Sequence, residues 1–174
     1  MKFARIASIL IVLSVVLYTL RTDQIVSIHD LSNKITKRMK RESPKYDKKM
    51  VVNNIEMSVA LAISKEEQTQ GLMEISTLPD NAGMLFIFDQ EGGWGFWMKN
   101  TLIPLDMIWI NKSFEIVDIQ TAPPCPPEEK DCPAYRPTVP AKYVLEVNGG
   151  WAKRNNVTVG NKVNIDRILS DVSL

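Results

Sequence analysis

Histidine is almost absent from this chain of 174 residues, because His29 is the only one. From residue 51 onward there is no imidazole for a Ser-His-Asp triad, a Cys-His pair or a His-ligated metal site. Cysteine is limited to Cys125 and Cys132, too few for a four-ligand structural zinc site within one chain. We therefore predict neither a metal nor another cofactor.

Net charge is also small, since 21 Lys and Arg against 20 Asp and Glu give +1. This balance argues against a general polyanion binder, and we expect no nucleic-acid partner. The charges are unevenly distributed, however. Residues 1–50 contain 11 Lys or Arg and 4 Asp or Glu, whereas residues 51–174 contain 10 and 16. The basic arm and the acidic body are therefore different regions.

The N-terminus contains an apolar run, Ile6–Leu20, which follows Lys2 and Arg5. As a helix its 15 residues span roughly 22 Å, which suits a short membrane span or a long signal sequence. No small-x-small cleavage site follows, so we expect residues 1–20 to be an uncleaved, single-pass signal anchor. Cleavage, which would make the protein a secreted one, is the alternative. The membrane is thus a predicted partner, through residues 6–20.

Residues 21–50 are predicted to be a basic amphipathic stalk and linker. Gln24–Glu42 has apolar residues at helical spacing and basic residues between them. Such a helix lies on anionic lipid or forms a stalk, and the Ser43-Pro44 step then leads into the body. Basic residues flank both ends of the apolar run, so they leave the membrane orientation open.

Short strand signals fill residues 51–166. Ile55–Ile63 and Trp94–Met98 alternate with a period of two, and Leu105–Ile110 and Phe114–Thr121 flank an Asn-Lys-Ser turn. Further strands are predicted at Met84–Phe88, Lys142–Val147, Val157–Val159 and Val163–Ile165. We expect one short helix after a capping box at Ser64, ending near Gly71, and a helical turn at Trp151–Asn155.

This pattern predicts a mainly β domain with short helices, of the α+β class. The expected architecture is a small closed or partly closed β-barrel or sandwich behind an N-terminal membrane segment. Residues 167–174 are taken as a C-terminal tail.

Seven of the ten prolines and both cysteines lie between Ala122 and Pro140. Proline removes donors from a strand ladder, and a long loop of this kind is commonly functional. Six residues separate Cys125 from Cys132, which is not the spacing of a CxxC redox centre. We predict an ordered lid with a structural disulfide. A disulfide requires an oxidising compartment, which favours an extracytoplasmic, periplasmic body.

Several segments of the body together form a distinctive series. They are Gly71-Leu72-Met73, Gly83-Met84-Leu85-Phe86, the block from Phe96 to Asp106 (FWMKNTLIPLD), Tyr135, the block from Pro140 to Val147 (PAKYVLEV), Gly150 and Val159-Gly160. In this order and spacing they resemble the domain-of-unknown-function family 192, over roughly Glu56–Val163. The resemblance implies a compact β-rich fold in a small prokaryotic protein, commonly with an export or membrane segment. It implies no established reaction.

The block around Trp97 supplies the candidate ligand-binding residues. In this interpretation Trp97 and Met98 form the floor of a pocket, and Asn100, Thr101 and Asp106 converge on it as polar groups. Apolar walls with a few polar groups are the usual design of a small-molecule site.

Asp106 also has a structural interpretation. A carboxylate within an apolar strand needs hydrogen-bond donors, and we predict that Lys99–Thr101 supply one. Glu146 lies between Leu145 and Val147 and either faces outward or approaches Asp106. In the second case the two carboxyl groups could serve as general acid and base.

Two functions therefore remain open. The first is a membrane-tethered, extracytoplasmic module that binds a small-molecule ligand or assists another protein without catalysis. The second is a carboxylate-dependent hydrolase or lyase that uses Asp106 and Glu146. The distance between those two carboxyl groups discriminates between them, because glycosidase-like pairs lie about 5–9.5 Å apart.

Overall fold

The computed structural model of the protein describes residues 43–126, 128–129 and 131–172. Its strands are β1 (Lys48–Val52), β2 (Ile55–Ala62), β3 (Ala82–Gly92), β4 (Phe96–Trp97), β5 (Leu105–Ile110), β6 (Ile116–Ala122), β7 (Ala134–Tyr135), β8 (Ala141–Asn148) and β9 (Val163–Asn164). Its helices are α2 (Lys65–Gln70), α3 (Trp151–Arg154) and α4 (Asp166–Asp171).

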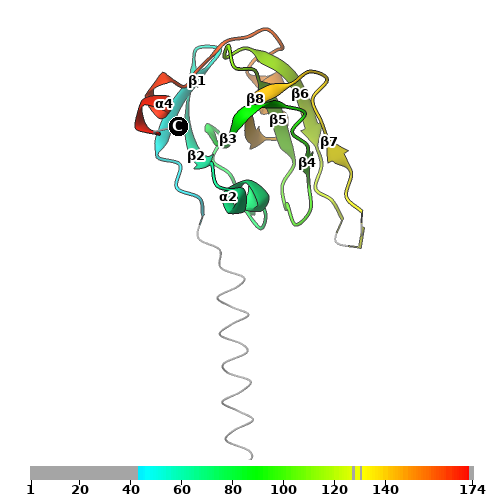
Figure 1. Ribbon diagram of the computed structural model, residues 1–174. Coiled ribbons are helices and arrows are strands. Elements are labelled where there is room, and N and C mark those ends of the chain that lie inside the picture. Colours follow the sequence, from blue (N-terminus) through cyan, green and yellow to red (C-terminus); the bar gives the residue numbers. More distant parts are fainter. Residues whose placement is uncertain (1–42, 127, 130, 173–174) are drawn as a thin grey trace, which may run out of the picture. The chain divides into compact units, whose positions relative to one another are not determined.

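One curled sheet dominates the fold, with the strand order β6-β5-β8-β3-β2-β1-β9 (Figure 1). Its neighbours are antiparallel except β2 and β3, which are parallel and are connected through α2. A bridge between Glu115 and Lys162 joins the chain just before β6 to the chain just before β9. The predicted mainly β class with short helices is confirmed, and the sheet is a half-barrel.

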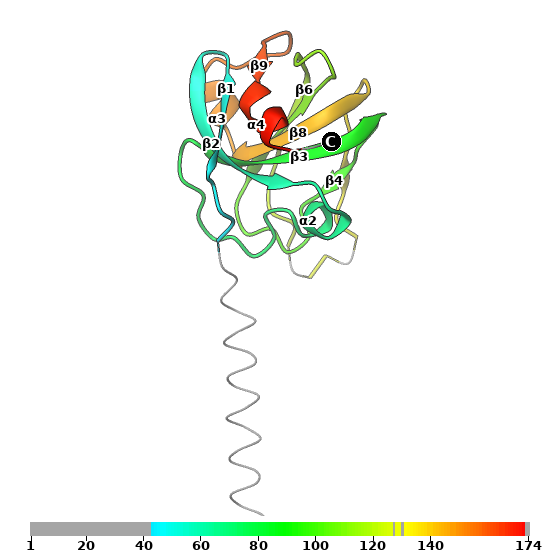
Figure 2. The ribbon, with the colours of Figure 1, turned by 60° about the vertical axis from the view of Figure 1, so that its left-hand side comes forward.

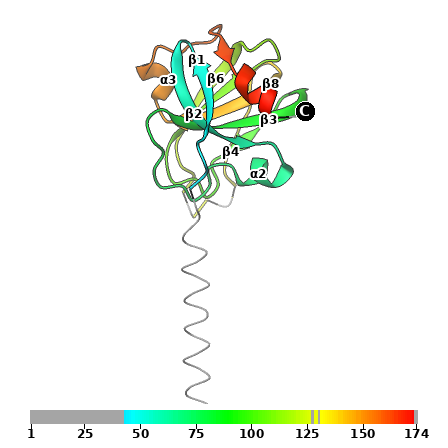
Figure 3. The ribbon, with the colours of Figure 1, turned by 90° about the vertical axis from the view of Figure 1, so that its left-hand side faces the viewer.

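Both faces of this sheet are covered, which is why all six residues of β5 are buried. The face that we call the Trp151 face packs Ile108, Leu145 and Val147 against Trp151 of α3. The opposite face, which we call the Leu72 face, packs residues such as Met84, Phe86, Met107 and Val144 against Leu72 and Ile75 in the loop after α2. In Figures 2 and 3, α3 and α4 accordingly lie above β3, and α2 and β4 lie below it.

Helix α2 begins as predicted. The Ser64 hydroxyl accepts from the Glu67 amide, and the Glu67 carboxylate accepts from the amides of Ile63 and Ser64, which completes the capping box. These bonds hold the pKa of Glu67 below its usual value. The helix ends at Gly71, whose φ of 45° lies in the region that favours glycine.

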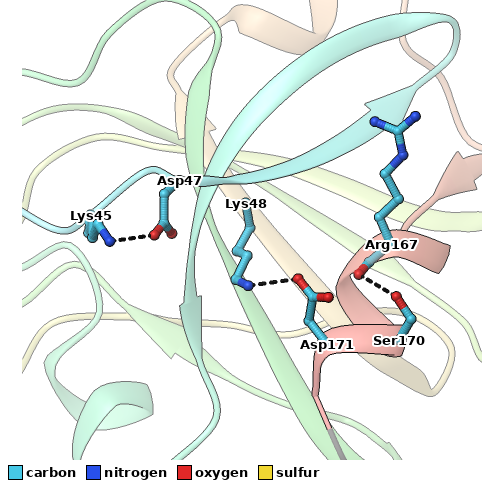
Figure 4. A network of polar contacts seen from close by, with 6 residues as sticks. All are labelled: Lys45, Asp47, Lys48, Arg167, Ser170 and Asp171. Atoms are coloured by element: carbon cyan, nitrogen blue, oxygen red, sulfur yellow. Dashed lines mark hydrogen bonds and ion pairs between the residues drawn. The ribbon is translucent and has the colours of Figure 1, made fainter.

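Helix α4 was not predicted, because residues 167–174 were taken as a tail. It contributes Ile168 to the core of the Trp151 face and lies against β1. An ion pair of 2.8 Å between Lys48 of β1 and Asp171 of α4 joins the two elements (Figure 4). With only six residues and a single buried one, the helix shows too little periodicity for detection from the sequence.

The other predicted elements vary in accuracy. Leu105–Ile110 is confirmed to the residue, and the segment Ile55–Ile63 to within one residue. The predicted strand Trp94–Met98 shrinks to the two residues of β4, which pair with β7 in a separate small sheet. Residues 157–159 are not a strand, since their backbone forms turns beside β6 and β9.

The predicted membrane segment, residues 6–20, and residues 21–42 of the predicted stalk and linker, residues 21–50, lie outside the described residues. The rest of that linker is described, and its last three residues, 48–50, belong to β1, so the sheet begins earlier than predicted. Within the part of the chain that the structure describes, no helix combines the length and apolar character that crossing a membrane requires.

Candidate ligand-binding site

The five predicted site residues do not converge on one pocket. Trp97 is 47% exposed, whereas Met98 is only 1% exposed and belongs to the core of the Leu72 face. Asn100 is exposed in a turn with φ of 55°, and Thr101 beside it is buried. Asp106 lies on the other face of the sheet, so these side chains cannot bind one small molecule together.

Asp106 holds the start of α3. Its Oδ1 accepts from the Thr121 hydroxyl at 2.7 Å and from the Gly150 amide at 2.8 Å, and its Oδ2 accepts from the Ala152 amide at 2.8 Å. The prediction that Lys99–Thr101 supply the donor was wrong. Alternation along β5 turns Asp106 toward the Trp151 face, where the amides at the N-terminal end of α3 lie.

Glu146 is buried on the Leu72 face and is 4% exposed. In the sheet register Met84 of β3 and Met107 of β5 lie directly on either side of it. Gly71 lies over the carboxyl group, since a Cβ at that position would be 3.8 Å from Glu146 Oε2. Burial in these surroundings raises the pKa of Glu146 to about 8.

The register separates the two carboxyl groups. Asp106 pairs with Val147, and Glu146 pairs with Met107, so the acidic side chains leave adjacent strands toward opposite faces. The sheet itself lies between them. The acid–base pair considered from the sequence is therefore not formed.

An aromatic groove lies at the margin of the Leu72 face. It has a volume of about 280 Å³ and is lined by Phe86, Phe88, Trp94, Phe96 and Trp97, with Lys65, Gln68 and Thr69 of α2 on its other side. Both tryptophans come from the short segment around β4, which brings them beside the far end of β3.

The aromatic walls of this groove are fixed by contacts among themselves. Phe88 and Trp94 stack with centroids 4.2 Å apart, and Phe86 and Phe96 meet edge to face at 4.8 Å. The buried Trp109 indole donates to the Trp94 carbonyl at 3.0 Å and so anchors the segment from beneath. The groove is therefore a preformed feature of the fold.

A second hollow continues the groove along α2. Its volume is about 510 Å³, and four of its lining residues, Lys65, Gln68, Phe88 and Trp94, also line the aromatic groove. Ile63, Asp89 and Gln90 complete it. We call the two together the α2–β3 cleft. The groove has aromatic walls, and the second hollow is lined mainly by polar groups, so the cleft offers a ligand both kinds of contact.

The Cys125–Cys132 disulfide is present, with a Cα–Cα distance of 5.8 Å, as predicted. It borders a smaller hollow of about 210 Å³ that also contains Asn100, Leu102, Glu74 and Glu129. Of the predicted site residues, Trp97 thus lines the α2–β3 cleft, and Asn100 lines this separate hollow.

Most of the residues that line the cleft were not predicted from the sequence. Phe86 and Phe88 were predicted only as part of the strand Met84–Phe88, and Lys65 and Gln68 only as part of the short helix after Ser64. A usable signal was present, since aromatic residues at alternate positions precede and follow the turn at Glu91–Gly93. Within the described residues there is no group of three or more His, Cys, Asp or Glu side chains that could hold a metal ion.

Comparisons with known proteins place this fold among uncharacterised relatives. The family model DUF192, described as an uncharacterized ACR, matches residues 47–165. A crystal structure from Novosphingobium aromaticivorans, of a protein of unknown function, is 32% identical, with a TM-score of 0.60, and the match covers 67% of this chain and 83% of that one. A crystal structure from Sinorhizobium meliloti, described as a candidate transcription regulator, is 30% identical, with a TM-score of 0.60, covering 70% and 96%. No curated protein matches the chain.

Proposed function

The chain belongs to the DUF192 family, and we propose that it is a non-catalytic ligand-binding module held outside the cytoplasm by an N-terminal membrane segment. The observation that carries this proposal is the α2–β3 cleft. It combines five aromatic side chains with the polar ends of Lys65, Gln68 and Thr69, and its aromatic walls are braced by stacking and by the Trp109 bond. Preformed walls of this kind bind a ligand without first having to be ordered.

The alternative, a carboxylate-dependent hydrolase or lyase, has no support in the arrangement of its two acids. Asp106 is occupied by three hydrogen bonds at the start of α3, and Glu146 faces the other side of the sheet. Neither carboxyl group lines the α2–β3 cleft. We therefore propose binding without catalysis.

The proposed location rests on two features. The apolar run at residues 6–20, with Lys2 and Arg5 before it, has the length of a short membrane span. The disulfide between Cys125 and Cys132 favours an oxidising compartment for the body. N-terminal sequencing of the mature protein tests the anchor, because a start near Arg21 or later would mean a cleaved signal. Labelling of free thiols in the native host tests the compartment, because two reactive thiols before reduction would contradict it.

The Sinorhizobium protein is described as a candidate transcription regulator, which raises the question of a nucleic-acid ligand. The charge of this chain argues against such a ligand. Residues 51–174 contain 10 Lys or Arg and 16 Asp or Glu. A body with that excess of negative charge repels a phosphate backbone. We therefore propose a ligand that is not a polyanion.

Binding arrays test the proposed function. Full-length protein in detergent micelles is applied to arrays of short peptides and of oligosaccharides, together with the variants Trp97→Ala and Val159→Ala. Val159 is a matched control because it is 59% exposed and lies outside the cleft. We expect Trp97→Ala to weaken binding about tenfold and Val159→Ala to leave it unchanged. Absence of any binding, or equal binding by both variants, would contradict the proposal.

A further inference from the structure

Two exposed apolar side chains of the body lie in one short turn. Trp97 is 47% exposed and Leu102 is 56% exposed. Lys99 lies between them in the chain and places its ammonium group 5.3 Å from the centroid of the Trp97 ring. Trp97 also lines the aromatic groove, but close to half of its surface remains open to solvent. We call residues 97–102 the Trp97–Leu102 turn.

The backbone of this turn is braced by the fold. Met98, within it, is buried in the core of the Leu72 face. The Thr101 amide donates to the Met98 carbonyl at 3.1 Å, and the Glu74 amide donates to the Asn100 carbonyl at 2.8 Å. The two exposed apolar side chains are therefore presented on a preformed turn, which does not have to be ordered before it binds a surface.

The described chain enters the body close to this turn. It begins at Ser43, and Tyr46 packs against the core of the Leu72 face, as do Ile103 and Cys125. In Figures 1, 2 and 3 the cyan start of the body lies at the lower end of the domain, where α2 and the yellow chain between β6 and β7 also lie. Leu102 and the disulfide border the same small hollow. The point of entry and the exposed turn thus belong to the same side of the domain.

We propose that the Trp97–Leu102 turn rests in the surface of the lipid bilayer that holds the N-terminal segment. This inference rests on the proposed function and adds a second contact with the membrane. The apolar run ends at Leu20, and residues 21–42 connect it to the body. An indole ring suits the boundary between headgroups and acyl chains, because it is apolar and carries one polar N–H. The neighbouring Lys99 can extend its charge from that boundary into water.

The tether explains how so small an apolar surface is sufficient. Two side chains bury too little area to hold a free domain on a bilayer, and single exposed apolar residues are common on soluble proteins. A body that is attached through residues 6–20 is already close to the lipid, so a weak contact does not have to offset the loss of free diffusion. The attachment of the chain therefore favours lipid over a partner that must be recruited from solution.

The charges beside the turn favour a zwitterionic lipid surface. Glu74 and Glu129 line the hollow next to Leu102, and Lys99 is the only cation among the residues that line it. Anionic headgroups would be repelled by these two carboxylates. Phosphatidylcholine is therefore the lipid used in the test.

The test measures the contact of Trp97 with lipid in the full-length chain. The protein is incorporated into nanodiscs of phosphatidylcholine brominated near the headgroup, because bromine quenches tryptophan fluorescence at short range. We expect quenching in the parent and about threefold less in Trp97→Phe, since Trp109 and Trp151 are buried. The control combines Trp97→Phe with Val159→Trp. It should not restore the quenching, because Val159 is 59% exposed but lies in the turns beside β6 and β9.

A second pair of variants keeps every tryptophan in place. Leu102 does not line the α2–β3 cleft, so Leu102→Glu should leave ligand binding unchanged and weaken only the lipid contact. We expect Leu102→Glu to lower the quenching about threefold and the matched change Val159→Glu to leave it as in the parent. Equal quenching in these two variants, or none in a parent that co-elutes with nanodiscs, would overturn the lipid contact and leave the binding site in the cleft standing.

Two further outcomes would also overturn the lipid contact. A chain that does not enter nanodiscs would contradict the membrane segment itself, and the second contact with it. An unquenched parent that cross-links as a dimer, when Leu102→Glu does not, would assign the turn to a second copy of the chain.

Discussion

The two buried carboxyl groups of this domain lie on adjacent strands and have opposite surroundings. Asp106, on the Trp151 face, accepts three hydrogen bonds, two of them from amides at the start of α3. Glu146, on the Leu72 face, lies between Met84 and Met107, and burial raises its pKa to about 8. The Asp106 carboxyl group is thus held by donors at the start of a helix, whereas burial raises the pKa of Glu146, and the neighbouring elements cause the difference.

Removal of Asp106 is expected to have the largest effect on stability. Asp106→Ala leaves the amides of Gly150 and Ala152 without their acceptor in a buried place. We expect the free energy of unfolding to fall by about 4 kcal/mol, measured by urea denaturation. Thr121→Val is the control, because it removes one donor only and should cost about 1 kcal/mol. Equal losses in the two variants would mean that Asp106 does not hold α3.

The contribution of Glu146 to stability, in contrast, should depend on pH. Because its pKa of about 8 in the folded protein exceeds the unfolded value, the native state binds the extra proton between those two pH values. Its contribution to stability is present in acid and is lost as the pH rises toward 8. From pH 5.5 to pH 8 we expect a loss of about 3 kcal/mol.

Glu146→Gln should remove this loss, so the variant gains on the parent as the pH rises. Urea denaturation of both proteins at several pH values measures the difference, and Glu56→Gln, an exposed change on β2, serves as control. A difference between Glu146→Gln and the parent that stays constant across this pH range would contradict the assignment.

The two faces of the sheet are covered differently. Cys125 of the disulfide packs against the Leu72 face, whereas α3 and α4 cover the Trp151 face. Replacement of both Cys125 and Cys132 by serine is expected to cost about 2.5 kcal/mol, from the chain entropy of the small closed loop. Thermal unfolding with and without a thiol reductant measures it. The parent should lose stability on reduction and the double variant should not. A parent that is insensitive to reductant would show that the disulfide does not brace this face.

The smallest expected effect concerns α2. Ser64→Ala removes the side chain that accepts from the Glu67 amide, which should cost about 1 kcal/mol. Because Gly71 at the end of this helix lies over Glu146, fraying should admit water and lower the pKa of Glu146 toward its usual value. The pH dependence of stability should then shrink. Ser170→Ala in α4 is the control. An equal change in the pH dependence of stability in that variant would mean that fraying of α2 at Gly71 does not act on the pKa of Glu146.

Much of the fold was predictable because its signals are local. The capping box at Ser64, the hairpin of β5 and β6 and the alternation in β2 each depend on residues close together in the chain. The disulfide could also be predicted, since two cysteines permit only one intramolecular pairing.

The candidate site was less predictable because its parts meet only through strand order. Lys65 and Trp97 both line the α2–β3 cleft, yet nothing in the local pattern places one near the other. Likewise, the separation of Asp106 from Glu146 follows from the register between β5 and β8, which alternation in one strand cannot give. The partner of Asp106 was misjudged for the same reason.

The position of β8 determines when the sheet can be completed during synthesis. β8 is a central strand, between β3 and β5, although it is among the last strands in the sequence. While the ribosome makes the chain from its N-terminus, β3 and β5 emerge as apolar strands whose backbone edges stay unpaired until β8 follows. Until β8 emerges, the strands β5 and β6 are not joined by strand pairing to β1, β2 and β3. Completion of the sheet consequently follows the emergence of β8, is governed by long-range pairing and is sensitive to aggregation.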